Sequence, residues 1–203
     1  MRALIVLCLC GFLVCCQSIE NNSRYVSTAS EAMASTEQII INGQGSGSAF
    51  YLGGDLWGTA KHCVQEMRPD GMFYNITMNG VECEIIVTSN KHDIAIFRVK
   101  TDKKIKPFRF ASSYPGLSEV IFSCGWHFGY EETFSVGYVA KHYNDVLVHT
   151  IPMNGGCSGG PTLNTSFEII GVNSAILTMH GGWNGVSYSA KGHNLLKLLR
   201  GLK

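Results

Sequence analysis

Residues 154–164 read NGGCSGGPTLN and place a cysteine and a serine side by side between two pairs of glycines. Both Cys157 and Ser158 carry side chains that can act as nucleophiles. Glycines permit a tight turn, in which the amides of Gly156 and Ser158 can converge on one point while the hydroxyl enters a cleft. The alternative is a glycine-rich hairpin loop in which the serine and the cysteine are incidental, since such loops are common.

The sequence around this stretch consists of short apolar or alternating runs separated by glycine and asparagine. Between residues 38 and 190 these runs are rich in β-branched and aromatic residues, which indicates antiparallel strands. Only residues 192–203, GHNLLKLLRGLK, have the leucine spacing of a helix. About a dozen short strands fit two small barrels better than one sandwich. Residues 100–116 are the best candidate for the connection between the two halves.

The N-terminal sequence MRALIVLCLCGFLVCCQS has the pattern of a secretory signal peptide. Arg2 provides a short positive region, and the apolar run of residues 3–14 is too short to span a bilayer. We therefore expect residues 1–18 to be removed and the mature chain to be secreted or periplasmic. A buried N-terminal strand and a lipid-anchored form are minor alternatives. Residues 19–37 are polar and are expected to form a linker or a loosely held N-terminal segment.

The composition limits the partners and cofactors that the protein can have. The 203 residues include 16 Lys and Arg and 15 Asp and Glu, with no basic run, which argues against nucleic acid or an anionic membrane as the main partner. Four of the eight cysteines lie within residues 1–18. The others could form two disulfides in an exported chain; they are Cys63, Cys83, Cys124 and Cys157. Their spacing contains no paired C-x-x-C and the histidines are scattered, so we expect no metal and no cofactor.

Two further residues could act with the serine. The run GTAKHCV, residues 58–64, places His62 at the end of a predicted strand, and SNKHDIAIFRV, residues 89–99, places Asp93 at the start of another. Either residue alone is more often a surface or turn residue. Together with Ser158, however, they supply a base, an acid that orients the base, and a nucleophile. Three such residues at strand ends of a two-barrel pattern are hard to obtain by chance.

These blocks resemble the three signature blocks of chymotrypsin-fold serine proteases, in the order His, Asp, Ser. The HtrA/DegP-like branch is the most similar. GSGSAFYLGGDLWGTAKHCV resembles its first hairpin and histidine block, HDIAIFRV its aspartate block, and GGCSGGPTLNTSFEIIGVNSAIL its serine block. The final VSYSAKGHNLLKLL resembles the end of such a protease domain. The resemblance covers about residues 38–200 and leaves no room in this sequence for the C-terminal PDZ domain of many relatives.

The resemblance implies an all-β fold of two six-stranded antiparallel β-barrels, a chymotrypsin-like double barrel with a C-terminal helix. The expected protease domain is residues 38–203. Its parts are barrel one at about 38–105, barrel two at about 106–190 and the helix at about 191–201.

The resemblance also implies roles for individual residues. His62 is expected to be the general base and then the general acid, Asp93 to hold its tautomer, and Ser158 to attack the scissile carbonyl. Ser174 occupies the position of a serine that supports the aspartate. The oxyanion hole is assigned to the backbone of Gly156, Cys157 and Ser158, with the first and last as N–H donors.

The resemblance distinguishes the two candidate nucleophiles. In this fold two glycines directly follow the nucleophile, and only Ser158 satisfies that pattern. Cys157 replaces the aspartate that pairs with a newly cut N-terminus in digestive trypsin-like enzymes, so we expect no activation of that kind. Cys63 follows the histidine, where trypsin-like enzymes have a bridged cysteine, but the matching strand here has no cysteine. A bridge between Cys124 and Cys157 is conceivable.

The resemblance assigns the walls of the substrate pocket to Pro152 and Met153 before the loop and to Asn173, Ala175 and Ile176 after it. No acid lies among them, so we expect cleavage after small aliphatic residues rather than after lysine or arginine. The leading hypothesis is an exported serine endopeptidase that acts on proteins or peptides. The alternatives are a catalytically silent or latent binding module of the same fold, and a cysteine-dependent hydrolase that uses Cys157.

Overall fold

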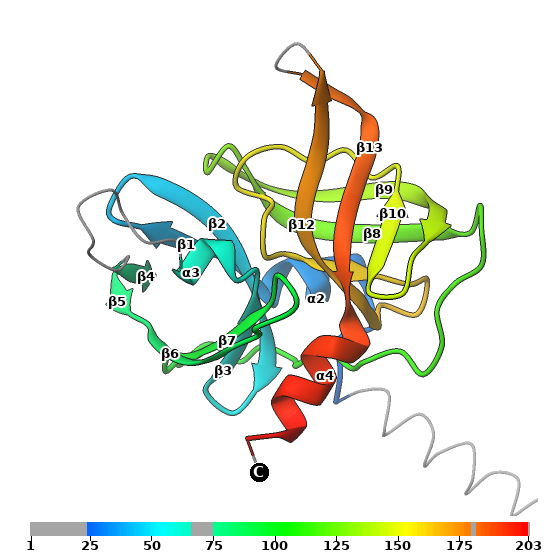
Figure 1. Ribbon diagram of the computed structural model, residues 1–203. Helices are drawn as coiled ribbons and strands as arrows, with labels where there is room; N and C mark the ends of the chain where they lie inside the picture. The colour runs from blue at the N-terminus through cyan, green and yellow to red at the C-terminus, as the bar shows by residue number, and fades with distance from the viewer. Residues whose placement is uncertain (1–23, 66–74, 180–181, 203) are drawn as a thin grey trace, which may run out of the picture.

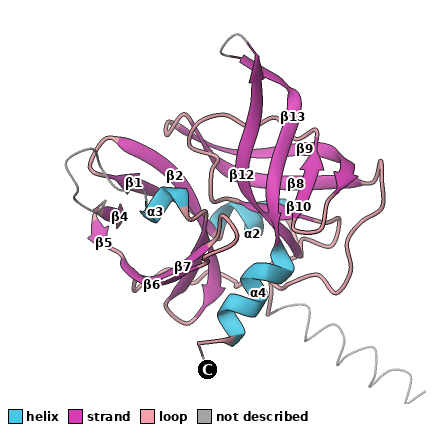
Figure 2. Ribbon diagram, viewed as in Figure 1, coloured by secondary structure: helices cyan, strands magenta, loops and turns pink. Residues whose placement is uncertain are grey.

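Two β-barrels lie side by side in the computed structural model, with a helix across one end (Figure 1). The structure describes residues 24–65, 75–179 and 182–202. Figure 2 shows that strands dominate both halves. The expected all-β double barrel with a C-terminal helix is therefore confirmed. The predicted signal peptide, residues 1–18, lies outside the described residues.

The first barrel is a nearly closed sheet in the order β5-β4-β1-β2-β3-β7-β6. Its strands are β1 (Thr36–Ile41), β2 (Gly45–Gly53), β3 (Leu56–Thr59), β4 (Ile76–Met78), β5 (Val81–Glu82), β6 (Glu84–Thr88) and β7 (Ala95–Arg98). The sheet has seven strands instead of the six expected because one strand is interrupted at Cys83, between β5 and β6. The Cys83 amide donates a hydrogen bond to the carbonyl of Ile76, at 2.8 Å. That corner carries the chain from one edge of the sheet to the other.

The second barrel is closed, in the order β10-β13-β12-β11-β8-β9, and has the six strands that were expected. They are β8 (Val120–His127), β9 (Glu131–His142), β10 (Val146–His149), β11 (Pro161–Leu163), β12 (Ile169–Met179) and β13 (Gly182–Lys191). The strand β12 has a register shift between Asn173 and Ala175, opposite β13. Such a bulge changes the direction of the side chains beside it.

Residues 99–119 connect the barrels without regular structure and are hydrogen-bonded to both. The Phe108 amide donates to Tyr51 in the first barrel, at 3.1 Å, and the Ala111 amide donates to Ile169 in the second, also at 3.1 Å. The connection therefore helps to hold the two barrels together.

The helices α2 (Ala29–Ala34) and α4 (Gly192–Arg200) pack against the barrels. The segment expected to be a linker or a loosely held N-terminal segment contains α2. Thr28 caps this helix, because its hydroxyl accepts a hydrogen bond from the Glu31 amide. Ala32 on this helix is fully buried. Part of the expected linker or N-terminal segment is therefore an ordered helix, which the cap stabilises and the buried alanine packs against the barrels.

The helix α4 follows the second barrel but also completes the core of the first. Leu195 is fully buried in the same cluster as Phe50 and Trp57. A Cβ at Gly58 would lie only 3.1 Å from Cδ2 of Leu195. Glycine at this position therefore leaves the space into which Leu195 packs.

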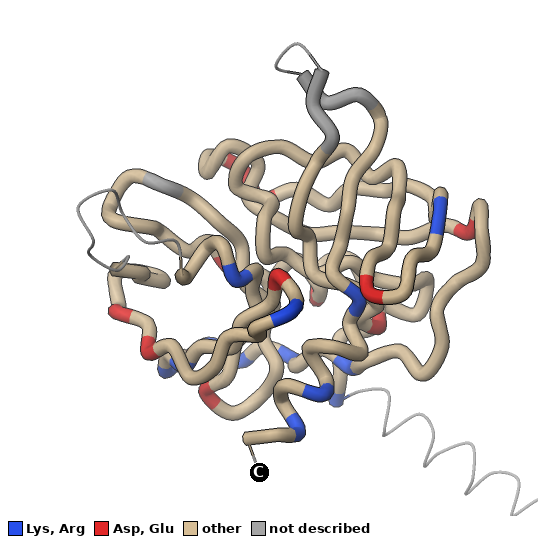
Figure 3. Tube along the Cα trace, in the orientation of Figure 1, with Lys and Arg blue, Asp and Glu red and all other residues tan. Residues whose placement is uncertain are grey.

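The surface carries charges of both signs on each barrel (Figure 3), as expected from the balance of 16 basic and 15 acidic residues. Within the described ranges, no helix is both long enough and apolar enough to cross a membrane.

Candidate active site

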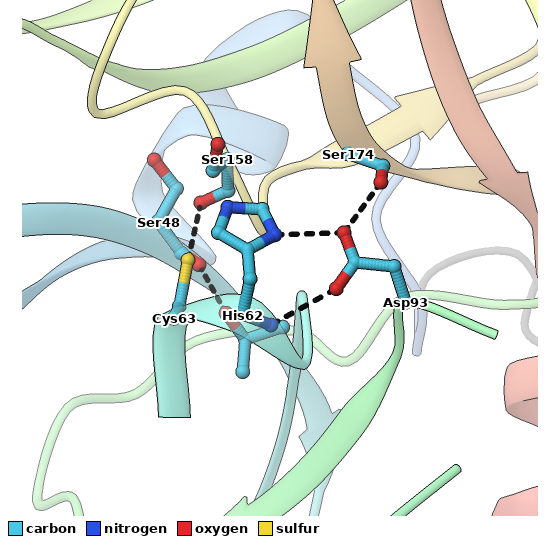
Figure 4. Close-up of polar contacts among 7 residues, drawn as sticks. Ser48, His62, Cys63, Asp93, Ser158 and Ser174 are labelled. Carbon is cyan, nitrogen blue, oxygen red and sulfur yellow. Dashed lines mark hydrogen bonds and ion pairs between the residues drawn. The ribbon is translucent and has the colours of Figure 1, made fainter. Parts of the chain in front are cut away.

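The candidate site lies between the barrels, and each barrel supplies part of it (Figure 4). His62 is the first residue of the short helix α3 (His62–Gln65), which follows β3 after a short turn, and Asp93 precedes β7. Ser158 lies in the loop between β10 and β11, and Ser174 lies on β12. The first barrel therefore positions the imidazole and the carboxylate, and the second positions the hydroxyl groups.

Three hydrogen bonds fix the carboxylate of Asp93. Its Oδ2 is 2.7 Å from Nδ1 of His62, and its Oδ1 accepts from the backbone N–H of His62 at 2.9 Å. The hydroxyl of Ser174 donates to Oδ2 as well. Because the carboxylate accepts from Nδ1, the neutral imidazole keeps Nε2 unprotonated and able to accept a proton.

The same contacts raise the pKa of His62 and lower that of Asp93, and both shifts favour the charged forms. The hydrogen bond with Asp93, followed by the effect of the neighbouring Cys63 side chain, raises the pKa of His62 above its ordinary value, although burial acts in the opposite direction. Burial raises the pKa of Asp93, but hydrogen bonds from His62 and Ser174 outweigh it, so the pKa lies below its ordinary value. The carboxylate is therefore ionised at neutral pH and stabilises a protonated imidazole.

The nucleophile loop needs glycine at two positions. Gly156 has a φ of +93° and Gly159 a φ of +87°, which other residues rarely adopt. A side chain on Gly156 would collide with the carbonyl oxygen of Trp126, and one on Gly159 with Thr59 and the carbonyl oxygen of Ser48. The glycines thus let the loop pass close to both β8 and the first barrel.

Two backbone amides of this loop are free to bind an oxyanion. Among the described residues, the N–H groups of Gly156 and Ser158 donate no hydrogen bond to the protein. The N–H of Cys157, which the sequence analysis also included, instead donates to the carbonyl of Asn154 at 3.2 Å. The arrangement can therefore offer two donors to a developing negative charge.

The imidazole of His62 lies between Ser158 and Asp93 in Figure 4. In the part of the chain that the structure describes, no hydrogen bond joins the hydroxyl of Ser158 to His62. This bond is often long in a free enzyme and shortens when substrate binds. The base thus faces the nucleophile on one side and the carboxylate on the other.

A cavity of about 200 Å³ opens beside the nucleophile. It is lined by Met153, Asn154, Gly155, Ser158, Ser174, Ala175 and Ile176. A larger cavity, about 430 Å³, lies along the same stretch of β12 and shares two of these residues, Ser174 and Ala175. Together the two cavities make room for an extended ligand beside β12.

Asn173 does not line this pocket, although the sequence analysis placed it there. Its side chain is fully buried and donates to the hydroxyl of Ser123 at 2.7 Å and to the carbonyl of Cys157 at 3.2 Å. The bulge after Asn173 explains the difference, because it separates this inward-facing side chain from the pocket-facing ones that follow. Asn173 therefore supports the nucleophile loop from inside the barrel.

Ser48 on β2 is a residue of the site that the sequence analysis did not identify. Its amide donates to the carbonyl of Ser158 at 2.7 Å, and its hydroxyl donates to the carbonyl of Gly156, also at 2.7 Å. The only sequence signal is a run of small residues, GSGS, which is equally typical of an ordinary strand close to another backbone.

The four cysteines in the described residues are free thiols, so the conceivable bridge between Cys124 and Cys157 is not formed. Cys63 lies beside the nucleophile loop, where its Sγ is 3.6 Å from the carbonyl oxygen of Ser158. A Cβ on Gly47, on the neighbouring strand β2, would lie 3.0 Å from the same sulfur.

Comparison with known proteins identifies the family of the chain. A family model described as a trypsin-like peptidase domain matches residues 47–172. The chain is 27% identical, over 154 residues, to a probable periplasmic serine endoprotease, DegP-like, of Hahella chejuensis; the match covers 72% of this chain and 33% of that protein. It is 26% identical over 175 residues to Protease Do-like 1, chloroplastic, of Arabidopsis thaliana, covering 77% and 39%. The chain spans about a third of the length of the curated relatives it matches.

Solved structures of proteases share the fold. The HtrA-type protease AlgW with a tripeptide superimposes with a TM-score of 0.70 at 16% identity, over 85% of this chain and 62% of that one. The serine endoprotease from Yersinia pestis superimposes with a TM-score of 0.68 at 18% identity, over 87% and 67%. At these identities the likeness concerns the fold alone.

Proposed function

Because the chain belongs to the trypsin-like peptidase family, we propose that it is a serine endopeptidase that hydrolyses peptide bonds with Ser158, His62 and Asp93. The observation that carries the proposal is the 2.7 Å contact between Nδ1 of His62 and Oδ2 of Asp93, with Ser158 on the other side of the imidazole. The two free amides of the nucleophile loop supply the second requirement of acyl transfer, a site for the oxyanion.

The proposed reaction proceeds in two halves. Nε2 of His62 accepts the proton of the Ser158 hydroxyl while Oγ attacks the scissile carbonyl, whose oxygen becomes negative and binds the N–H groups of Gly156 and Ser158. The imidazolium, stabilised by Asp93, then protonates the leaving amine, and the peptide bond breaks to leave an acyl-enzyme. In the second half His62 takes a proton from water, the hydroxide attacks the acyl group, and Ser158 regains its proton as the acid product leaves.

The pocket supports cleavage after small aliphatic residues. Met153, Ala175 and Ile176 give the 200 Å³ cavity apolar walls, and no lysine-binding acid is among its described lining residues. Asn173 contributes indirectly, because it holds the loop rather than the ligand. A pocket of this size accepts valine, alanine, isoleucine or leucine, and one methylene changes the preference by only about 1–3 kcal/mol. Profiling with a peptide library tests this preference, and cleavage mainly after lysine or arginine would contradict it.

We also propose that the enzyme is exported, with residues 1–18 as the signal peptide, 19–37 as the N-terminal segment and 38–203 as the protease domain. The support is the pattern of the N-terminal sequence and the periplasmic description of the Hahella chejuensis relative. Mass spectrometry of the secreted chain tests this. A chain that keeps its first 18 residues would contradict the proposal.

A serine-directed fluorophosphonate probe tests the catalytic proposal directly. The wild type should be labelled, Ser158→Ala should not be labelled, and Cys157→Ala, a change one residue away, should be labelled like the wild type. Peptide cleavage that is lost in Cys157→Ala but kept in Ser158→Ala would instead identify a cysteine-dependent enzyme. A folded wild type that neither reacts nor cleaves peptides would favour the alternative, a silent binding module.

A further inference from the structure

Three consecutive peptide groups of the nucleophile loop are each held by their carbonyl oxygen. The oxygen of Gly155 accepts from the Phe128 amide at 2.6 Å, in the turn between β8 and β9. The oxygen of Gly156 accepts from the hydroxyl of Ser48 at 2.7 Å. The oxygen of Cys157 accepts from the Gly160 amide at 3.1 Å and from the Asn173 side chain at 3.2 Å.

These contacts determine where the free amides point. In a trans peptide the N–H and the C=O of one group point in opposite directions, and no described peptide bond is cis. Fixing the oxygen of Gly155 therefore turns the N–H of Gly156 away from β8. Fixing the oxygen of Cys157 likewise turns the N–H of Ser158 away from the barrel interior. The peptide between Gly156 and Cys157 lies between these two donors, so its orientation controls their relative position.

Ser48 holds the carbonyl oxygen of that middle peptide, whose N–H makes a longer bond of 3.2 Å to the carbonyl of Asn154. The hydrogen bonds of Ser48 itself leave its hydroxyl one orientation. Its side chain is fully buried. Its Oγ accepts from the amide of Trp126 at 2.9 Å, and since that amide can only donate, the hydroxyl proton is left for the oxygen of Gly156. The Ser48 amide meanwhile holds the carbonyl of Ser158. One residue of the first barrel thus contacts both sides of the oxyanion-binding segment of the second.

We propose that Ser48 is a positioning residue that keeps the oxyanion hole assembled in the free enzyme; the inference rests on the proposed function. Within the described residues, the hydroxyl of Ser48 is the hydrogen-bond donor to the buried carbonyl of Gly156. Without it that carbonyl loses its partner, which is unfavourable inside a protein. Gly156 has the conformational freedom to let the peptide rotate away in response. Rotation would move the two N–H groups apart and weaken their hold on the oxyanion.

The test compares Ser48→Ala with Ser35→Ala. Ser35 is a matched control, because it is also buried in the first half of the chain and its hydroxyl donates to a main-chain carbonyl, that of Lys106, at 2.8 Å. The measurements are kcat and KM on a p-nitroanilide peptide ending in valine, and inhibition by the boronic acid of the same peptide. The boronate adduct of Ser158 places an oxygen in the oxyanion hole, whereas KM reports mainly on the pocket.

In Ser48→Ala we expect kcat to fall about 10- to 100-fold and boronate inhibition to weaken by a similar factor, since losing one such donor outright costs about 10²–10³. KM should stay within about twofold. Ser35→Ala should lose stability without either kinetic change. A Ser48→Ala enzyme with the kcat of the wild type overturns the inference.

If Ser48→Ala does not fold, Ser48→Cys provides the second variant, because a thiol of similar shape is a weaker donor. A reduced kcat with unchanged KM supports the inference, and a kcat equal to that of the wild type overturns it. The two proposals fail differently. A folded wild type without activity overturns the proposed function and the inference that depends on it, whereas an active wild type matched by both Ser48 variants overturns the inference alone.

Discussion

The two barrels have different interiors. The first is filled by large apolar side chains, and Phe50, Trp57, Ile96 and Phe97 are fully buried there. The second buries a row of polar side chains beside a smaller apolar cluster; they are Ser123, His149, Thr162, Asn173 and Ser189. The first barrel supplies a rigid support for His62 and Asp93, whereas the second directs the nucleophile loop through hydrogen bonds. Apolar contacts fix where an element lies, whereas hydrogen bonds, which depend on angle, also fix the orientation of a peptide group.

The polar row of the second barrel forms one connected network. Nε2 of His149 lies 2.8 Å from the hydroxyl of Ser189, which lies 2.6 Å from that of Thr162. The Thr162 hydroxyl donates to the Asn173 amide oxygen at 2.9 Å, and the amide nitrogen of Asn173 donates to the carbonyl of Cys157. The network thus runs from a buried histidine to the nucleophile loop.

The largest expected effect comes from the part of the site that the first barrel supplies. Asp93→Asn places an amide of nearly the same shape beside His62. If this amide donates to Nδ1 of His62, the proton of the neutral imidazole must lie on Nε2. Nε2 can then no longer accept the proton of Ser158. We expect kcat/KM to fall about 10⁴-fold with the fold retained. Steady-state kinetics measures this, with the exposed Asp102→Asn as the control. A loss below tenfold would mean that the Asp93 carboxylate is not what orients His62.

The apolar interior should be most sensitive to lost volume. Phe97 is fully buried on β7, so Phe97→Ala should lower the free energy of unfolding by about 3–5 kcal/mol, whereas Phe97→Leu should cost much less. Denaturant unfolding of both variants measures the difference. Equal losses in the two would show that the first barrel depends on the aromatic ring itself rather than on filled volume.

The polar interior should be most sensitive to acid. The Ile151 amide donates to Nδ1 of His149 at 3.3 Å, so Nδ1 is the acceptor and Nε2 carries the proton toward Ser189. Burial lowers the pKa of His149 from 6.5 to about 4. Because the folded pKa is the lower one, the unfolded chain takes up a proton first. Stability should therefore fall by about 3 kcal/mol as the pH drops from about 6.5 to about 4.

Unfolding in denaturant across this pH range measures the effect, and the variant His149→Phe should remove that part of the slope. His92→Asn, which changes a histidine outside the network, is the control and should keep it. A wild type whose stability is flat from pH 6.5 to pH 4 would contradict a neutral histidine in the barrel.

The smallest expected effect comes from a covalent bond added to the first barrel, between β2 and α3. A Cβ at Gly47 would lie 3.0 Å from the sulfur of Cys63, close to the spacing across a disulfide. Oxidised Gly47→Cys should be more stable than its reduced form by about 2 kcal/mol, less than the loop length alone allows, because Ile39 must shift. Thiol titration and thermal unfolding measure this, with Gly47→Ser as the control. Two free thiols after oxidation would contradict the predicted geometry.

The fold and the position of the candidate site could be predicted from the sequence, because the signals are local. His62, Asp93 and Ser158 each lie in a short block at a strand end, and alternating runs indicate the barrels. The features that escaped prediction depend on three-dimensional detail. The direction of Asn173 follows from a bulge, and the role of Ser48 follows from a contact across 108 residues of chain. Neither feature produces a periodic pattern or a motif, so it cannot be recognised in a short stretch of the sequence.

The position of α4 has a consequence for the order of events during synthesis. The ribosome makes Leu195 after every strand of both barrels, yet this residue is buried in one core with Phe50 and Trp57 of the barrel that is made first. The first barrel therefore cannot complete its core before α4 emerges, although domains usually fold as they are made. With the proposed function, an enzyme built this way would stay inactive while nascent. A chain that ends before Gly192 should accordingly fail to react with a fluorophosphonate and should bind a hydrophobic dye.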